Sequence, residues 1–546
     1  MMKKIIWTAV LCLILATANA QQISKIKPII SIDFEAQKTS NSLASFIGRD
    51  SIVEGIKGEA KFFSGSATND SFVRINNNEI LSSLWKDQDF SIEVWVQTIS
   101  ANDKFQVIAS NKEWNSGEIK DYTDNRYAGW SRVSGLNKGW AIICQPDGSW
   151  AWNIGNGKHD GKEERVESFR KDYRPTAPRQ KINDGEWHQL LFTINREANE
   201  ARIYFDGLNV AIYYMGPVKD LDAGLPVGLA TDALANNPDL TLDGALDEFN
   251  IYDYTLSSED VAQRYESFVS VAKIPRASAK HIDELNLLQW NIWHGGRRRG
   301  KEIGPQQVID FIKETNTDIV TMQETYGSGP MIADALGYYF YLSSANISIL
   351  SKYPIEKTWV EYDELWTGIA TIQLSTNQKI NLASIWLHYL PGWSSDAREQ
   401  DATPEKLIAG EAKNRHKEIK IILEKLKPQI DQADDIPIII GGDFNSPSHL
   451  DWVPAKKEWH NNLVVEWPVS QEMKNAGFKD SFRELHPDLD YSSATIPAEK
   501  LSWRIDYIYY KGAKLHAVKS DMHFKYKGIW PSDHPAVITT FTLEEY

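Results

Sequence analysis

Pro437-Ile-Ile-Ile-Gly-Gly-Asp443-Phe-Asn445 is the stretch that decides the fold of the carboxy-terminal half of the chain. Three isoleucines in succession predict a strand that is buried on both faces. Asp443 and Asn445 follow the apolar run at once, so we expect the strand to end in a loop of acidic and amide groups. Loops at strand ends are where a rigid scaffold presents catalytic groups. With its flanking glycines the motif also fits an ordinary Asx turn, so it does not establish a site alone.

The same combination of an apolar strand and a polar end recurs through residues 283–546. It places Asn291 after residues 285–290, Gln323 and Glu324 after 318–322, His388 after 382–387, Asp506 before 507–510, and Asp533 and His534 before 536–539. Each has a structural explanation as a turn residue or an interior histidine, but a fold gains nothing from gathering so many acids without a cation. Carboxylate and amide oxygens suit Mg²⁺ or Mn²⁺, whereas zinc would recruit more His or Cys.

Helical patterns separate these strands. Residues 306–314 place Val308, Phe311 and Ile312 on one face, and residues 414–426 form a clear amphipathic helix. Strands that alternate with helices predict a layered α/β domain.

The ordered polar series of residues 283–546 resembles the endonuclease/exonuclease/phosphatase superfamily, which includes secreted deoxyribonucleases, bacterial sphingomyelinases and inositol polyphosphate phosphatases. The matching motifs are Asn291, Gln323-Glu324, His388, Gly442-Asp443-Phe-Asn445, Arg504-Ile-Asp506 and Ser532-Asp533-His534. The resemblance implies a two-sheet α/β sandwich, flanked by helices, with the site at one edge. It also implies a metal-dependent phosphoric ester hydrolase.

The resemblance assigns a role to each residue. Glu324 is expected to be the principal metal ligand, with Asn291 and Asp533 near the same cation. His534 and Asp506 are expected to form a pair that activates water for in-line attack, and Asp443 is the competing candidate for general base. Asn445 and His388 are expected to donate hydrogen bonds to the phosphoryl oxygens. Ser-Ile-Trp-Leu precedes His388 where Thr-His-Leu is commoner, so the alignment there could slip by one residue.

The substrate is less well defined by the sequence. Arg297, Arg298 and Arg299 lie just beyond Asn291 and are candidates to hold an anionic substrate, or are a solvated loop. Trp393 is a candidate aromatic wall for a base, a sugar or a lipid head group, or a core residue. A phosphodiester in nucleic acid, phospholipid or phosphoglycan is expected, with a phosphomonoester of sugar or inositol as an alternative. No basic helix announces specific binding of duplex nucleic acid.

The amino-terminal half shows the short, alternating segments of an antiparallel β-structure. Residues 90–96, 187–194 and 201–205 are predicted strands, the last one turning at Asp206-Gly207. With Asp184-Gly-Glu-Trp-His188 and Gly244-Ala-Leu-Asp-Glu-Phe249, residues 28–268 resemble the laminin-G/concanavalin-A-like jelly roll, and residues 269–282 are expected to be a linker. The resemblance implies a possible glycan ligand. Asp33 and Asp247 are candidate Ca²⁺ ligands, or solvated turn acids.

Composition and the amino terminus bear on location. Residues 1–20 combine a basic start, a short apolar run and an Ala-Asn-Ala ending, which predicts a signal peptide and a soluble periplasmic or extracellular protein. The chain has 546 residues and a formal net charge of −15, which disfavours non-specific binding to polyanions. Cys12 and Cys144 are the two cysteines, and the first leaves with the signal peptide, so no disulfide is expected. The alternative to an enzyme is a carbohydrate-binding protein with a catalytically silent scaffold domain.

Overall fold

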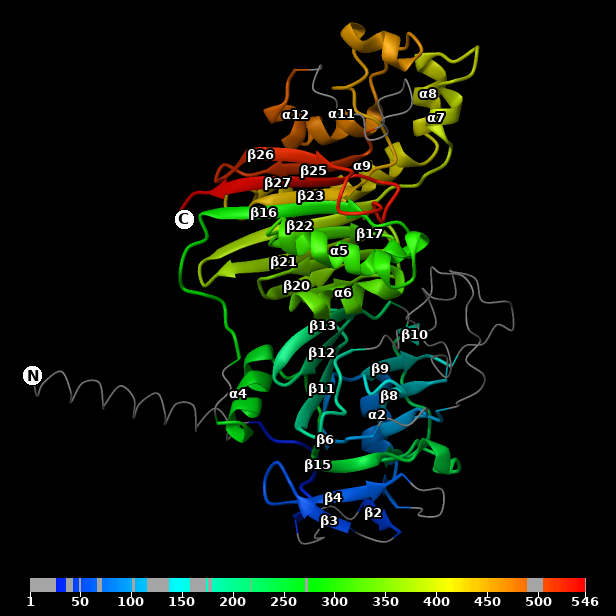
Figure 1. Cartoon of the computed structure of the whole chain (residues 1–546), viewed down its shortest axis with the longest axis vertical. Helices are drawn as coiled ribbons and strands as arrows, with labels where there is room; N and C mark the ends of the chain where they lie inside the picture. Colours follow the sequence, from blue (N-terminus) through cyan, green and yellow to red (C-terminus); the bar gives the residue numbers. More distant parts are fainter. Residues whose placement is uncertain are drawn as a thin grey trace, which may run out of the picture.

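The computed structural model describes residues 26–35, 43–48, 51–65, 71–100, 104–114, 137–157, 173–174, 179–216, 218–270, 274–488 and 504–545. The predicted signal peptide and part of the predicted linker, residues 271–273, lie outside these ranges. Two domains follow one another along the long axis of the molecule, as Figure 1 shows.

The amino-terminal domain is a sandwich of two sheets. The first contains β3 (Ser51–Glu54), β4 (Glu59–Ser64), β15 (Asp243–Tyr252), β6 (Phe90–Gln97), β11 (Trp187–Asn195), β12 (Glu200–Phe205) and β13 (Leu208–Tyr214), in that order, and β1 (Ile30–Ile32) also pairs with β15. The second contains β10 (Tyr173–Arg174), β9 (Trp150–Gly155), β8 (Gly139–Cys144), β7 (Gln106–Ser110), β14 (Val227–Leu229), β5 (Phe72–Ile75) and β2 (Ala44–Ile47). The helices are α2 (Glu79–Asp87), η3 (Pro238–Leu240) and α4 (Ser258–Phe268).

Strand β6 shows why its alternating pattern does not mean one solvated face. Ile92 and its apolar neighbours face the core between the sheets, but Glu93 on the other face is also fully buried. Helix α4 covers that face: Arg264 donates to Glu93, and Trp95 stacks on Tyr265 of the same helix. The period-two alternation of residues 90–96 fits a half-buried strand, but both faces of β6 are buried, because the closing helix packs on the polar side.

The carboxy-terminal domain places two sheets face to face between layers of helices. One sheet contains β26 (Leu515–His523), β27 (Ala536–Leu543), β16 (Glu284–Asn291), β17 (Ile319–Gln323), β19 (Ile347–Ser351) and β18 (Tyr339–Leu342). The other contains β20 (Ile355–Trp359), β21 (Thr367–Ser375), β22 (Gln378–Trp386), β23 (Ile438–Asp443), β25 (Asp506–Lys511) and β24 (Lys479–Asp480). The helices are η4 (His294–Arg299), α5 (Ile303–Glu314), η5 (Tyr326–Ser328), α6 (Gly329–Leu336), α7 (Trp393–Asp396), α8 (Pro404–Glu411), α9 (Arg415–Lys425), α10 (Lys427–Asp431), η6 (Pro454–His460), α11 (Pro468–Asn475) and α12 (Ser481–Leu485).

Side chains from both sheets fill the core between them, among them Leu287, Leu382 and Ile439. The outer face of the second sheet packs on α9, where Ile440 lies in one apolar cluster with Ile419. The run of isoleucines in β23 is thus buried on both sides, as the sequence predicted. Gly441 allows the two sheets to approach closely, since a Cβ there would lie 2.2 Å from Oγ1 of Thr321.

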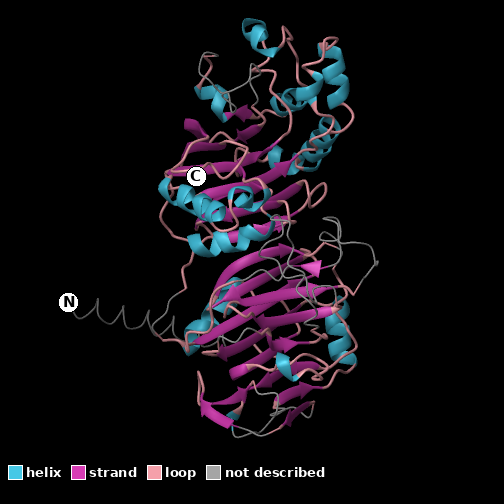
Figure 2. Cartoon of the chain, turned by 45° about the vertical axis from the view of Figure 1, so that its right-hand side comes forward, coloured by secondary structure: helices cyan, strands magenta, loops and turns pink. Residues whose placement is uncertain are grey.

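The two domains share one sheet. The edge strand β13 of the first domain pairs in parallel with the edge strand β18 of the second, through Ile212 with Tyr341 and Tyr213 with Leu342. A 14-stranded sheet therefore runs through both domains, and Figure 2 shows its strands following one another along the molecule. Asp334 of α6 adds a polar contact, because Nη2 of Arg179 in the first domain donates to it over 2.8 Å. No helix among the residues described here is long and apolar enough to cross a membrane.

Candidate active site

Strand ends from both sheets meet at one edge of the carboxy-terminal domain. Asn291 is the last residue of β16 and Glu324 directly follows β17, which lies beside it in the first sheet. In the second sheet, Asp443 at the end of β23 lies opposite Asp506 at the start of β25. The amide Nδ2 of Asn291 donates to Oδ2 of Asp443 over 3.1 Å and thereby links the two sheets. The polar groups predicted from separate strands thus lie in one place.

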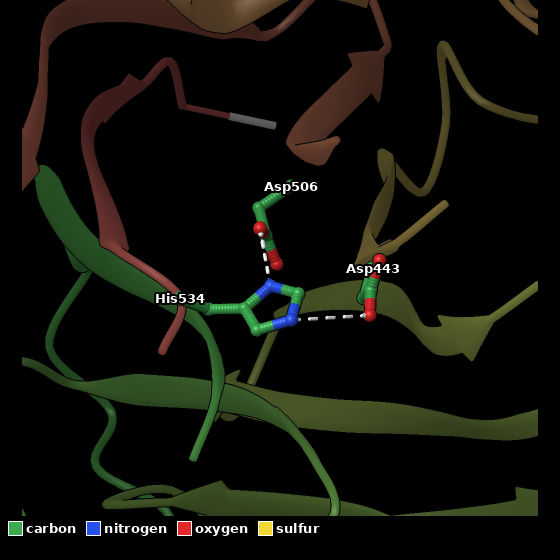
Figure 3. Close-up of side chains that lie close together, drawn as sticks. All are labelled: Asp443, Asp506 and His534. Carbon is green, nitrogen blue, oxygen red and sulfur yellow. Dashed lines mark hydrogen bonds and ion pairs between the residues drawn. The ribbon is translucent and has the colours of Figure 1, made fainter. Parts of the chain in front are cut away.

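His534 lies between two buried carboxylates, as Figure 3 shows. Its Nδ1 is 2.8 Å from Oδ2 of Asp506, and its Nε2 is 3.9 Å from Oδ2 of Asp443. Burial alone would lower the pKa of His534, but the charges of Asp506 and Asp443 outweigh it and raise that pKa well above its usual value. Burial also raises the pKa of Asp443. Within the described ranges, these three residues are the one group of three or more His, Cys, Asp or Glu side chains close enough to share a metal ion.

Glu324 and Asp533 complete an acidic cluster on the side of Asn291. Glu324 accepts a hydrogen bond from the backbone N–H of His294 over 2.9 Å, and Nδ2 of Asn291 lies 3.4 Å from its other oxygen. Burial raises the pKa of Glu324 and of Asp533. The nearby charge of Asp533 raises the pKa of Glu324 further. Several carboxylates held together at such a cost fit a divalent cation, which would offset their charge.

Asn445 and His388 are engaged in contacts with the loops around this centre. Asn445 has a positive φ of 49°, its backbone N–H donates to Asp443, and its Nδ2 donates to the carbonyl of Leu387 over 2.9 Å. His388 uses Nδ1 to accept a hydrogen bond from the backbone N–H of Leu390, and its ring stacks on Trp366 with centroids 5.3 Å apart. Both residues therefore hold the loops at the edge of the site.

Trp386 is the residue that sequence reasoning missed. It pairs with Asp443 across β22 and β23, and its indole Nε1 donates to Oδ2 of Asp443 over 3.0 Å. Matching Ile385-Trp-Leu387 with the commoner Thr-His-Leu of the resembled superfamily would have placed Trp386 at the histidine position. In the structure it is Trp386, two residues before His388, that contacts Asp443.

The candidate substrate residues divide into exposed and buried ones. Arg297 is only 8% exposed, because Nε donates to Ser328 and Nη1 to the carbonyl of Lys301. Arg298 and Arg299 are exposed and lie over the ring of Trp293. Trp393 is 6% exposed and packs edge-on against two other tryptophans, so its side chain belongs to the core and not to a wall of the site.

Two buried arginines support the site from behind. Arg504, which opens the Arg-Ile-Asp506 motif, donates to Asp451 over 2.9 Å and to Asp480 over 2.6 Å. Arg415 forms an ion pair with Glu411, 2.6 Å from Nε to Oε1, and Glu411 also accepts from Ser446, next to Asn445. The signal of the second pair in the sequence is weak, because a glutamate and an arginine four residues apart are usually solvated.

In the amino-terminal domain, the two candidate calcium ligands bond to backbone amides. Asp247 accepts from the backbone N–H groups of Glu248 over 2.8 Å and of Lys57 over 3.3 Å. Burial raises its pKa to about 7. Asp33 accepts from the backbone N–H of Glu35 over 3.3 Å. These contacts give both carboxylates a structural role, Asp33 in the loop after β1 and Asp247 within β15.

Comparisons with known proteins agree with the two domains. Residues 288–534 match the model of the Endonuclease/Exonuclease/phosphatase family, and residues 67–262 match that of the Concanavalin A-like lectin/glucanases superfamily. A relative from Caenorhabditis elegans, "Uncharacterized protein F14F9.5", is 28% identical over 294 residues, which cover 47% of this chain and 91% of that protein.

Similar solved structures include D. rerio TDP2 humanized by 14 mutations, with 16% identity, a TM-score of 0.33, and coverage of 47% of this chain and 99% of that one. The human Nocturnin catalytic domain with bound sulfate has 16% identity, a TM-score of 0.35, and coverage of 48% and 94%. The assignment rests on the family models. The carboxy-terminal half of the chain is a domain of the endonuclease/exonuclease/phosphatase family, a metal-dependent and nuclease-like phosphoric ester hydrolase, joined to an amino-terminal concanavalin A-like domain.

Proposed function

We propose that this protein is an exported phosphodiesterase that cleaves its substrate by in-line attack of water, without a covalent enzyme intermediate. The observation that carries the proposal is the position of His534 between Asp506 and Asp443. The bond from Nδ1 to Asp506 fixes the tautomer and the orientation of the imidazole, so that Nε2 points toward Asp443. A pair arranged in this way suits general acid–base catalysis.

His534 and Asp443 act on one water in this proposal. Nε2 and Oδ2 are 3.9 Å apart, too far for a direct hydrogen bond but close enough for both to contact the same water. The proton of the attacking water passes to this pair, whose two members titrate together because their charges interact. Asp443 remains the competing general base; if it accepts the proton, His534 as an imidazolium would instead stabilise charge on the phosphoryl group.

Glu324, Asp533 and Asn291 would hold a divalent cation, Mg²⁺ or Mn²⁺, which when bound would neutralise a non-bridging phosphate oxygen and the charge on the leaving oxygen. Arg298 and Arg299 at the rim would attract the anionic substrate. Asn445 and His388 would act through the loops that they hold, with the backbone of these loops near the phosphoryl oxygens. The predicted signal peptide supports export, and the concanavalin A-like domain supports a glycan-decorated target.

The test compares bis-(p-nitrophenyl) phosphate with p-nitrophenyl phosphate in Mg²⁺, in Mn²⁺ and in EDTA. We expect hydrolysis of the diester that depends on the metal and falls at least ~10²-fold in His534→Ala and in Asp443→Asn. The matched control is His416→Ala, because His416 pairs with Glu472 over the same 2.8 Å but lies on α9, outside the site. It should retain full activity.

Other results would redirect the assignment. A preference for the monoester would support a phosphomonoesterase of sugar or inositol phosphates. No turnover of either compound in either metal would support the alternative of a carbohydrate-binding protein with a silent scaffold domain. Export is tested by amino-terminal sequencing of the protein isolated from the culture medium and from the periplasm. If the protein is exported, residues 1–20 should be missing.

A further inference from the structure

Four aromatic rings gather beside Asp443, at the end of β22, in the loop that follows it and just before β21. Trp366, Trp386, His388 and Tyr389 form this cluster, which we name the aromatic platform. Their planes are within 30° of each other in every stacked pair: Trp366 and Trp386 differ by 9°, with centroids 5.1 Å apart, and His388 and Tyr389 differ by 13°, with centroids 5.2 Å apart. Tyr389 also stacks on Trp386, with centroids 6.0 Å apart. Parallel rings of this kind present a flat apolar face.

The aromatic platform connects the solvent to the catalytic centre through two rings. Tyr389 is 54% exposed. Trp386 behind it donates its indole N–H to Asp443 over 3.0 Å. A flat group that lies on Tyr389 would therefore be one ring away from the carboxylate that faces His534.

The loop that carries Tyr389 is held in place by buried groups. Arg415, almost fully buried, donates to the carbonyls of His388 and Pro391 over 3.1 and 2.9 Å. Asn414 donates to the carbonyl of Leu390, and Glu418 accepts from the backbone N–H of His388. Because Arg415 also pairs with Glu411, which bonds Ser446 of the Asp443 loop, one ion pair fixes both loops. A surface fixed in this way loses little entropy when it binds a ligand.

We propose that the aromatic platform stacks a nucleobase of the substrate next to the scissile phosphate, an inference that rests on the proposed phosphodiesterase activity. Every base has a flat face that stacks on aromatic side chains. A sugar ring is usually held by several hydrogen bonds as well, and two of the polar atoms on these rings are already engaged, the N–H of Trp386 by Asp443 and Nδ1 of His388 by Leu390. Tyr389 offers one exposed ring, which suits a single unpaired base and not a stacked duplex.

Three diesters with the same p-nitrophenol leaving group test the proposal, carrying thymidine, the deoxyribose without a base, or glucose on the other side. The wild-type protein should have the lowest KM for the thymidine diester. Tyr389→Ala should raise that KM roughly 5- to 100-fold, with kcat and both other KM values changed less than about twofold. Tyr389→Phe keeps the ring and should behave as wild type. Trp459→Ala removes another exposed aromatic ring, on η6, and serves as the matched control.

The outcomes separate this inference from the proposed function. If the wild-type protein with metal hydrolyses none of the three diesters, the phosphodiesterase assignment itself fails. If it hydrolyses them but Tyr389→Ala changes all three equally or none, the aromatic platform does not read the base. A selective loss on the glucose diester would overturn the inference in favour of a sugar. If Tyr389→Ala also impairs cleavage of single-stranded oligothymidylate, the natural substrate is a polynucleotide. If it impairs only the thymidine diester, the natural substrate is a mononucleotide ester. Either result supports the inference.

Discussion

Replacing Arg415 by methionine should cost the protein much of its stability. Arg415 and Glu411 are both almost fully buried, and burial raises the pKa of Glu411 even with the arginine beside it. In Arg415→Met the carboxylate keeps a single neutral donor, the hydroxyl of Ser446 at 3.0 Å. Breaking a buried ion pair by removing one partner costs about 3–5 kcal/mol, because the other charge is left uncompensated. The loop contacts to His388 and Pro391 are lost as well.

The assay is urea unfolding followed by tryptophan fluorescence, at pH 8 and at pH 5.5. Without Arg415, Glu411 should have a folded-state pKa well above its unfolded value, so stability is lost as the pH rises through the folded pKa. The deficit of Arg415→Met should therefore be larger at pH 8 than at pH 5.5. The double variant Arg415→Met/Glu411→Gln removes the stranded charge and should recover most of the loss.

The matched control is Lys427→Met. Lys427 pairs with Asp431 at the same spacing of four residues, but both side chains are more than half exposed. Its loss should change stability by less than about 0.5 kcal/mol. A deficit below about 1 kcal/mol in Arg415→Met, or a double variant no more stable than the single one, would refute the argument that a buried charge pair holds the two loops.

Three further substitutions test other contacts. Trp386→Phe keeps an aromatic ring but removes the N–H that donates to Asp443, so kcat should fall roughly 10- to 100-fold, with a shifted pH profile. Trp459→Phe, on η6 and outside the aromatic platform, is the control, and an unchanged kcat in Trp386→Phe would contradict a positioning role for Trp386. Asp247→Asn tests linkage: because burial raises the pKa of Asp247 to about 7, wild-type stability should fall as the pH rises from 5 to 8, while the variant's Tm in EDTA should change less. Gly441→Ala forces a Cβ against Thr321 and should cost about 1–3 kcal/mol in urea unfolding; an unchanged midpoint would show that the sheets can separate there.

Much of the site was predictable because its signals are local. Asn291, Glu324, Asp443 and Asp506 each lie at the end of a strand with a clear apolar pattern, and strands of a layered sheet place such ends at a common edge. The family models confirm the two-domain architecture and the α/β class of the second domain. The roles given to the individual residues stay predictions.

What was missed depends on contacts between distant segments. A three-arginine run does not reveal that Arg297 turns inward to Ser328 while its neighbours face the solvent. The place of Trp386 depends on the register of β22 against β23, which residue spacing alone leaves open by a position or two. The burial of Trp393 depends on two tryptophans more than fifty residues later in the chain. Nothing in the sequence of β13 and β18 announces that they pair, since the pairing joins only two residues of each.

The pairing of β13 with β18 also has a consequence for how the chain can be divided. Each of these strands would end its own domain's sheet, and an exposed strand edge with unpaired N–H and C=O groups invites pairing with other chains. In the intact protein each domain covers the vulnerable edge of the other, so neither needs the charged or proline-rich sequence that usually protects an edge strand. Producing the two halves as separate proteins, divided at residues 269–282, would uncover both edges at once, and the halves would tend to aggregate even where each retains its own core.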